Sequence, residues 1–149
     1  LVRLTVQNLK SPLEGHPVGL DLPPDLPLLR LDFRLMEHAL SNLLLNAAAY
    51  TPLGSPIRVG IRTGAGRLIL TVSDQGPGLP PEDLERVFDK FYRVPGSPAG
   101  GTGLGLFITR SLVQAHGGEV RASNQAAGGA AFSIELPVDK APPAPMERP

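Results

Sequence analysis

The sequence predicts an α+β fold in which an antiparallel or mixed, mostly antiparallel β-sheet carries its helices on one face. Helical and strand patterns cluster along the chain rather than alternating strictly, which is the element order of such a fold. Two pairs of short alternating segments are joined by glycine turns, and two longer stretches carry apolar residues at helical spacing. A chain of 149 residues is long enough for one compact domain with its own core.

The first 50 residues predict two helices and two short strands. Residues 1–10 have the pattern of a helix end, and Val18 to Leu22 alternates as a strand. Leu28 to Leu31 is predicted as a second short strand. Asp32 then occupies a helix N-cap position before a helix from Phe33 to Tyr50. The apolar residues of that helix recur at helical spacing and predict a buried stripe of Met36, Leu40, Leu43 and Ala47.

The rest of the chain predicts four strands, two helices and a tail. The strands cover residues 57–62, 68–73, 119–123 and 131–136. The helices cover residues 81–88 and about 103–116. Residues 139–149 are rich in proline and are predicted to be disordered.

Composition restricts the classes of partner. Fourteen basic and fourteen acidic residues cancel, so we expect neither nucleic acid nor an anionic membrane as a partner of this piece. The absence of cysteine excludes disulfides and thiolate metal sites. No apolar run is long enough to span a bilayer, and no signal peptide is visible. The chain begins with Leu, so we expect it to be part of a longer protein.

A glycine-dense loop leads directly into the predicted helix at residues 103–116. Gly101, Gly103 and Gly105 lack side chains, so a large anion can approach the main chain there. The helix N-terminus adds unpaired N–H groups and the positive end of the helix dipole. The spacing is not that of a P-loop or a dinucleotide-binding motif. By itself it fits a flexible loop with a helix cap equally well.

Three further motifs have polar residues at suggestive spacing. Asn42, Asn46 and Tyr50 share one helix face, and an asparagine oxygen suits Mg²⁺ bound beside substrate phosphates. Asp74 ends a strand, where its carboxylate can accept a hydrogen bond from an adenine amine. Gly76 and Gly78 follow it and would let a flat base lie against the main chain. Taken singly, these fit a solvated helix face and an ordinary turn.

The segment VFDKFYR supplies the last motif. Phe88 and Phe91 lie at i,i+3 and are predicted to fill the core beneath the glycine loop. Tyr92 can stack on a base, and Lys90 and Arg93 can reach phosphate oxygens.

In this order and spacing the motifs resemble the N, G1, F and G2 boxes of bacterial sensor histidine kinases. They are similar to the catalytic, ATP-binding domain of the GHKL superfamily, which also contains gyrase B and MutL. The matching segments are NLLLNAAAYTP, DQGPGLP, VFDKFYR and GTGLGLFITRSLVQAHGG, closed by GGAAFSIELP. The resemblance covers roughly Val18 to Val138, and residues 15–44 most resemble potassium-responsive members. It implies a two-layer α/β sandwich of the Bergerat ATP-binding type.

The resemblance also implies roles for individual residues. Asn46 would hold the Mg²⁺ of bound ATP, Asp74 would bind the adenine amine, and residues 94–102 would form a lid over the nucleotide. Lys90 and Arg93 are candidate phosphate contacts, and no residue is assigned a catalytic role. The residues implied to bind the nucleotide are Asn42, Asn46, Tyr50, Asp74, Gly76, Gly78, Tyr92, Arg93, Gly101, Thr102, Gly103, Leu104 and Gly105.

Two departures from the family pattern bear on activity. Ala49 stands where the N box usually has Lys, so one phosphate contact is missing. Leu45 stands where hydrolytic relatives have an acid that activates water. A neutral imidazole already has a lone pair, so phosphoryl transfer to histidine needs a base less. Leu45 therefore disfavours a plain ATPase and an anti-sigma-factor serine kinase, whereas Ala49 leaves a degenerate regulatory module open.

The resemblance implies a histidine kinase whose other parts lie outside this chain. Residues 1–12 would end a linker helix from an upstream dimerisation domain, and residues 13–138 would form the catalytic domain. The expected partners are that dimerisation domain, which carries the phosphoacceptor histidine, and a response regulator. The domain would be cytoplasmic, in a parent anchored in the inner membrane. No histidine here has the phosphoacceptor context: His116 is predicted to cap a helix, and His16 and His38 are not predicted to be catalytic.

Overall fold

The computed structural model describes residues 1–27, 29–95 and 103–138. Its sheet has five strands in the order β1-β2-β3-β5-β4. The strands are β1 (Val18–Asp21), β2 (Ile57–Gly64), β3 (Arg67–Ser73), β4 (Glu119–Asn124) and β5 (Ala130–Pro137). β1 and β2 are parallel and the other neighbouring strands are antiparallel. The predicted mixed, mostly antiparallel sheet is confirmed.

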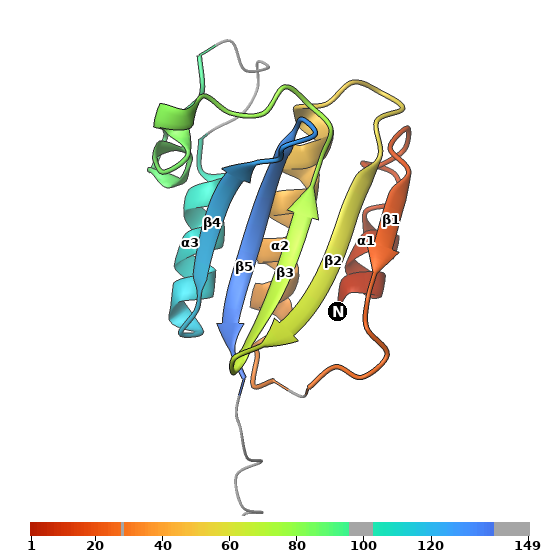
Figure 1. The fold of residues 1–149 in the computed structure, drawn as a ribbon, viewed down its shortest axis with the longest axis vertical. Coiled ribbons are helices and arrows are strands. Elements are labelled where there is room, and N and C mark those ends of the chain that lie inside the picture. Colours follow the sequence, from red (N-terminus) through yellow and green to blue (C-terminus); the bar gives the residue numbers. More distant parts are fainter. Residues whose placement is uncertain (28, 96–102, 139–149) are drawn as a thin grey trace, which may run out of the picture.

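Every α-helix in the part of the chain that the structure describes lies on one face of this sheet, so the domain has two layers (Figure 1). The α-helices of the described residues are α1 (Val2–Asn8), α2 (Phe33–Ala49) and α3 (Gly105–Ala115). The predicted stripe of α2 is buried, and strands β2, β3 and β5 bury alternate residues against it. Within the described part of the chain, the opposite face of the sheet has no helical layer, and it carries polar pairs such as Thr71 with Ser133 and Arg67 with Glu135. The predicted two-layer α/β sandwich is therefore confirmed.

Two predicted elements are wrong. The described part of the segment 28–31 is irregular, although Leu29 and Leu31 still pack against the core. Pro23, Pro24 and Pro27 precede it, and proline cannot donate to a strand ladder. Residues 81–88 form two short 3₁₀ turns, η1 (Pro81–Asp83) and η2 (Arg86–Phe88), instead of one α-helix. A segment this short forms few i→i+4 bonds, so the tighter turns compete well.

Within the described ranges, no helix is both long enough and apolar enough to cross a membrane.

The N-cap of α2 offers a direct test of the local sequence prediction. The Asp32 carboxylate accepts a hydrogen bond from the Leu35 backbone N–H at 3.1 Å. We expect Asp32→Ala to cost about 1 kcal/mol, which lowers the melting temperature by about 2–4 °C in a domain of this size. The bond from the Asp32 backbone N–H to His116 Nε2 stays in place, so the loss isolates the side-chain cap. Thermal unfolding of Asp32→Ala measures this loss of stability, and Asp25→Ala, at an exposed loop position, is the control. Equal melting temperatures of the two variants would contradict the capping role of Asp32.

Candidate functional site

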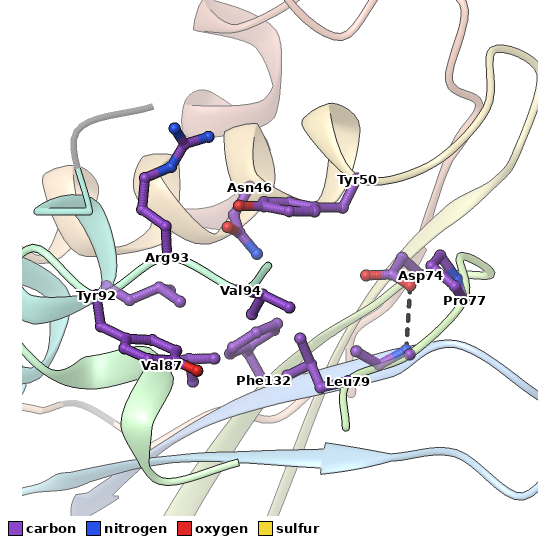
Figure 2. A pocket seen from close by; sticks show the side chains of 13 residues that line it. Asn46, Tyr50, Asp74, Pro77, Leu79, Val87, Tyr92, Arg93, Val94 and Phe132 are labelled. Atoms are coloured by element: carbon purple, nitrogen blue, oxygen red, sulfur yellow. Dashed lines mark hydrogen bonds between the residues drawn. The ribbon is translucent and has the colours of Figure 1, made fainter. Parts of the chain in front are cut away.

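A cleft opens where the C-terminal end of α2 meets the loops that follow β3 and η2. Its empty space, which includes solvent at the open mouth, is about 510 Å³. The residues that line it are Asn46, Tyr50, Asp74, Pro77, Gly78, Leu79, Val87, Tyr92, Arg93, Val94, Leu106, Ala130 and Phe132. In Figure 2, Asp74 lies at one end of this space, and Tyr92 and Arg93 lie at the other. The predicted motifs thus meet in one place.

Asp74 is held on several sides by backbone and side-chain hydrogen bonds. It is only 5% exposed, and its Oδ1 accepts from the N–H groups of Gly76 at 2.9 Å and Ala130 at 3.1 Å. Its backbone N–H donates to the Ala130 carbonyl at 2.9 Å, and its carbonyl accepts from Gln125 Nε2 at 2.8 Å. Among the described residues, these bonds leave Oδ2 as the carboxylate oxygen that a ligand can reach. Asp74 is therefore a fixed hydrogen-bond acceptor in a mostly apolar cleft.

The two glycines after Asp74 are required by close packing. A Cβ at Gly76 would lie 2.8 Å from the Tyr50 carbonyl oxygen, so the loop sits directly on the end of α2. Gly78 has a φ of +80°, and a Cβ there would lie 2.8 Å from Asn124 Oδ1. Of the two, Gly78 lines the cleft and Gly76 supports it from behind. The loop that carries Asp74 is therefore fixed against both α2 and β4.

Apolar side chains form most of the cleft wall. Leu79, Val87 and Phe132 lie on its lower side in Figure 2, opposite Asn46 and Tyr50. Phe132 packs edge-on against buried Phe88 with ring centroids 6.2 Å apart, which supports the wall from the core. A flat apolar ring with one polar edge directed at Asp74 matches this lining.

Tyr92 is fixed at the far end of the cleft by a buried carboxylate. Its hydroxyl donates to Asp83 Oδ1 at 2.5 Å, and Asp83 is buried. This hydrogen bond, followed by desolvation and the negative charge of Asp83, raises the pKa of Tyr92 above its usual value. The Tyr92 ring is therefore held in a defined position at this end of the cleft.

The prediction that Phe91 fills the core is wrong. Its side chain is 63% exposed, whereas Phe88 is buried as predicted. The turn η2 ends at Phe88, so the i,i+3 helical relation does not extend to Phe91, which has a φ of +68°. The Lys90 ammonium lies over the rings of Phe91 and Phe107, 5.5 and 5.8 Å from their centroids. Lys90 is thus placed on these rings and does not line the cleft.

The glycine loop is anchored to α2 and to the segment that contains Phe91. Asn42 Nδ2 donates to the Gly105 carbonyl at 3.2 Å, and Thr109 Oγ1 donates to the same oxygen at 2.9 Å. Gly103 has a φ of +74°, and a Cβ there would lie 2.6 Å from the carbonyl carbon of Phe91. A Cβ at Gly105 would meet no atom within 4 Å, so that glycine faces open space. Asn42 therefore positions the start of α3, and Gly105 leaves room beside it.

The comparison with known protein families adds the decisive observation. Residues 31–140 match the model of the family described as "Histidine kinase-, DNA gyrase B-, and HSP90-like ATPase". The chain belongs to this family. It is a histidine kinase-type ATPase domain, and its relatives include sensor kinases.

Two of these relatives are 42% identical to the ATPase domain. One is the sensor protein KdpD of Escherichia coli, over 136 residues, which are 91% of this chain and 15% of the relative. The other is the histidine-protein kinase AfsQ2 of Streptomyces coelicolor, over 117 residues, which are 77% of this chain and 22% of the relative. The chain thus spans less than a quarter of either relative. Among solved structures, the mycobacterial sensor histidine kinase MprB superposes with a TM-score of 0.79 at 30% identity, covering 92% of this chain and 91% of that one.

Not every predicted site residue lines the cleft of the ATPase domain. The structure brings together Asn46, Tyr50, Asp74, Gly78, Tyr92 and Arg93. It places Asn42, Gly76, Gly103, Leu104 and Gly105 in the elements around them. Gly101, Thr102 and most of the predicted lid lie outside the described residues.

Sequence reasoning missed Asn124, in the strand next to the cleft of the ATPase domain. Its Oδ1 accepts from the Leu79 N–H and its Nδ2 donates to the Leu79 carbonyl, both at 2.7 Å. An Asn before a glycine turn is common, so its spacing in the sequence indicates nothing special. The 45 residues between Asn124 and Leu79 make this pairing a property of the folded sheet.

The residues present fit a nucleotide-borne metal ion. Asn46 contributes a neutral oxygen donor at the cleft wall, which suits Mg²⁺ with most of its shell from water and phosphate. Within the described part of the chain, no group of three or more His, Cys, Asp or Glu side chains could hold a metal.

Proposed function

We propose that this chain is the ATP-binding catalytic domain of a two-component sensor histidine kinase. It binds Mg·ATP and presents the γ-phosphate to a histidine on a separate dimerisation domain. The observation that carries the proposal is the convergence of Asn46 and Asp74 on one apolar cleft in a member of this ATPase family. The relatives named as sensor kinases support the same function.

The base end of the cleft supports selectivity for adenine. Asp74 Oδ1 is occupied by two backbone N–H groups, so Oδ2 accepts from the exocyclic amine of the base. Guanine presents a carbonyl oxygen at the corresponding position of its ring and would face the carboxylate with an acceptor. The apolar wall that includes Leu79 and Phe132 excludes water around this hydrogen bond and strengthens it.

The phosphate end uses charge and backbone groups. Asn46 would hold Mg²⁺, which neutralises and bridges the phosphate oxygens when bound. Arg93 supplies a guanidinium at the cleft, and the N-terminus of α3 supplies a positive dipole end. Leu45, 39% exposed beside Asn46, provides no base to activate water, which favours transfer to an imidazole over hydrolysis. Positioning and charge neutralisation supply the catalysis.

The rest of the proposal concerns the longer protein. Residues 1–12 are the end of a linker helix, and residues 13–138 form the catalytic domain. The partners are the dimerisation domain with its phosphoacceptor histidine and a response regulator, without nucleic acid. The parent is an inner-membrane sensor kinase whose catalytic domain lies in the cytoplasm. The 42% identity to KdpD supports a potassium-responsive member of the family. Because AfsQ2 is equally identical, the stimulus of the parent protein has to be determined by experiment.

Two measurements test the proposal. Calorimetric titration should show ATP binding that Mg²⁺ strengthens, and absence of binding would leave the degenerate regulatory module as the better reading. The domain joined to its upstream dimerisation segment should then label itself with [γ-³²P]ATP on histidine. If the longer protein binds Mg·ATP but stays unlabelled, the kinase assignment is wrong.

Substitution of Asn46 tests the metal assignment. We expect Asn46→Ala to weaken Mg·ATP binding about tenfold, since losing one ligand or its water contact costs about 1.4 kcal/mol. Binding of adenosine, which carries no phosphate and no metal, should change less than about twofold. Asn8→Ala, at an exposed position on α1, is the matched control for both ligands. An equal loss of adenosine and Mg·ATP binding would place Asn46 at the base and remove it from the metal site.

A further inference from the structure

We infer that the β4–β5 turn, taken with its flanking strand residues as 124–130, is the positioning element of the base site, with Asn124 and Gln125 as its two positioning residues. The inference rests on the proposed function, because it concerns how the adenine-binding carboxylate is held. Neither residue lines the cleft. Both act through groups that do, Asn124 through Leu79 and Gln125 through Asp74.

Asn124 holds Leu79 as a neighbouring strand would. Its amide gives one acceptor and one donor, and these meet the N–H and the carbonyl of Leu79 at 2.7 Å each. Two short bonds to one residue fix both the position and the rotation of its backbone. Gly78, immediately before, packs so close that a Cβ would lie 2.8 Å from Asn124 Oδ1. The end of the Asp74 loop is therefore set by this one side chain.

The rest of the turn holds Asp74 itself. Gln125 Nε2 donates to the Asp74 carbonyl, while Ala130 pairs with both the Asp74 N–H and Oδ1. Gly129 lies so close that a Cβ would fall 2.0 Å from the Asp74 carbonyl oxygen. The turn is closed by hydrogen bonds from Gln125 N–H to the Gly129 carbonyl at 2.9 Å and from Gly128 N–H to the Gln125 carbonyl at 3.0 Å. Three of the four polar atoms of Asp74 are thus bonded by the turn.

This arrangement determines where the ligand-facing oxygen points. With its N–H, carbonyl and Oδ1 fixed, the carboxylate plane of Asp74 is fixed, and Oδ2 can face only the cleft. Loss of a bond from the turn would let the loop and the carboxylate shift together. The strength of a hydrogen bond to the adenine amine depends on its alignment. Such a shift should therefore reduce the preference for bases that carry this amine more than it reduces the binding of the ribose and phosphates.

Two substitutions separate these effects, and the first of them is nearly isosteric. Asn124→Asp keeps the acceptor for the Leu79 N–H but faces the Leu79 carbonyl with an oxygen in place of the amide NH₂. Gln125→Ala removes the bond to the Asp74 carbonyl and keeps the Leu79 pair. Ser123→Asp adds the same charge one residue earlier on the exposed surface of β4 and serves as the control.

The readout is selectivity, measured as the ratio of the affinities for ATP and for purine riboside triphosphate, which lacks the 6-amino group. We expect this ratio to fall about fivefold or more in Asn124→Asp and Gln125→Ala, and to be unchanged in Ser123→Asp. A variant that merely destabilises the fold lowers both affinities together and leaves the ratio constant. Melting temperatures confirm that each variant is folded at the titration temperature, and Gln125→Ala keeps the test decisive if Asn124→Asp unfolds.

The outcomes separate this inference from the proposed function. If the unsubstituted domain binds ATP with selectivity and both folded variants retain the full ratio, the positioning role is wrong and the proposed function stands. If the unsubstituted domain binds ATP and purine riboside triphosphate equally, Asp74 does not bind the amine, and both the adenine assignment and this inference are overturned.

Discussion

Replacing Asp74 with asparagine is expected to weaken ATP binding about 100-fold or more while leaving the fold intact. The amide oxygen of Asp74→Asn can still accept from the N–H groups of Gly76 and Ala130, so the loop keeps its internal bonds. The NH₂ group then occupies the Oδ2 position and faces the adenine amine, donor against donor. Losing a hydrogen bond to a charged acceptor and adding this mismatch costs about 3 kcal/mol or more, which is about two powers of ten in Kd.

Calorimetry and thermal unfolding together check this result. Asp25→Asn, at an exposed loop position, removes the same charge far from the cleft and should leave ATP affinity unchanged. The melting temperature of Asp74→Asn should stay within a few degrees of the unsubstituted domain. If a folded Asp74→Asn variant kept its ATP affinity, Asp74 would not be the residue that recognises adenine.

The second large effect is on stability and concerns Gly129. Its φ is +92°, and a Cβ there would lie 2.0 Å from the Asp74 carbonyl oxygen. Gly129→Ala therefore combines left-handed backbone strain, about 1–3 kcal/mol, with a backbone clash that no side-chain rotation relieves, about 1–3 kcal/mol. For a domain of this size we expect the melting temperature to fall by about 5–20 °C. ATP affinity should fall as well, because the clash falls on Asp74.

The adjacent glycine provides a matched control for this prediction. Gly128 has a φ of +104°, but a Cβ there would meet no atom within 4 Å. Gly128→Ala should thus show the strain alone, about 1–3 kcal/mol, without the clash. Thermal unfolding of the two variants side by side separates the two contributions, and equal shifts would contradict the close approach of the β4–β5 turn to Asp74.

Local patterns predicted the elements that depend on near neighbours in the chain. The N-cap at Asp32 and the stripe through Met36 and Leu43 were predicted because capping and helical periodicity act within a few residues. Phe91 was predicted wrongly because its spacing from Phe88 implies burial only if one helix continues through both, and η2 ends first.

By itself, the sequence determined the fold class, the long helix of the N box and the candidate residues Asn46 and Asp74. These follow from short-range periodicity and from motif order along the chain. Only the tertiary structure decided that both residues share one cleft, that Lys90 lies on aromatic rings, and that Asn124 holds Leu79. Strand order β3-β5-β4 brings the β4–β5 turn beside the loop after β3. Contacts between segments some 50 residues apart arise from sheet pairing and packing, which leave no fixed spacing in the sequence.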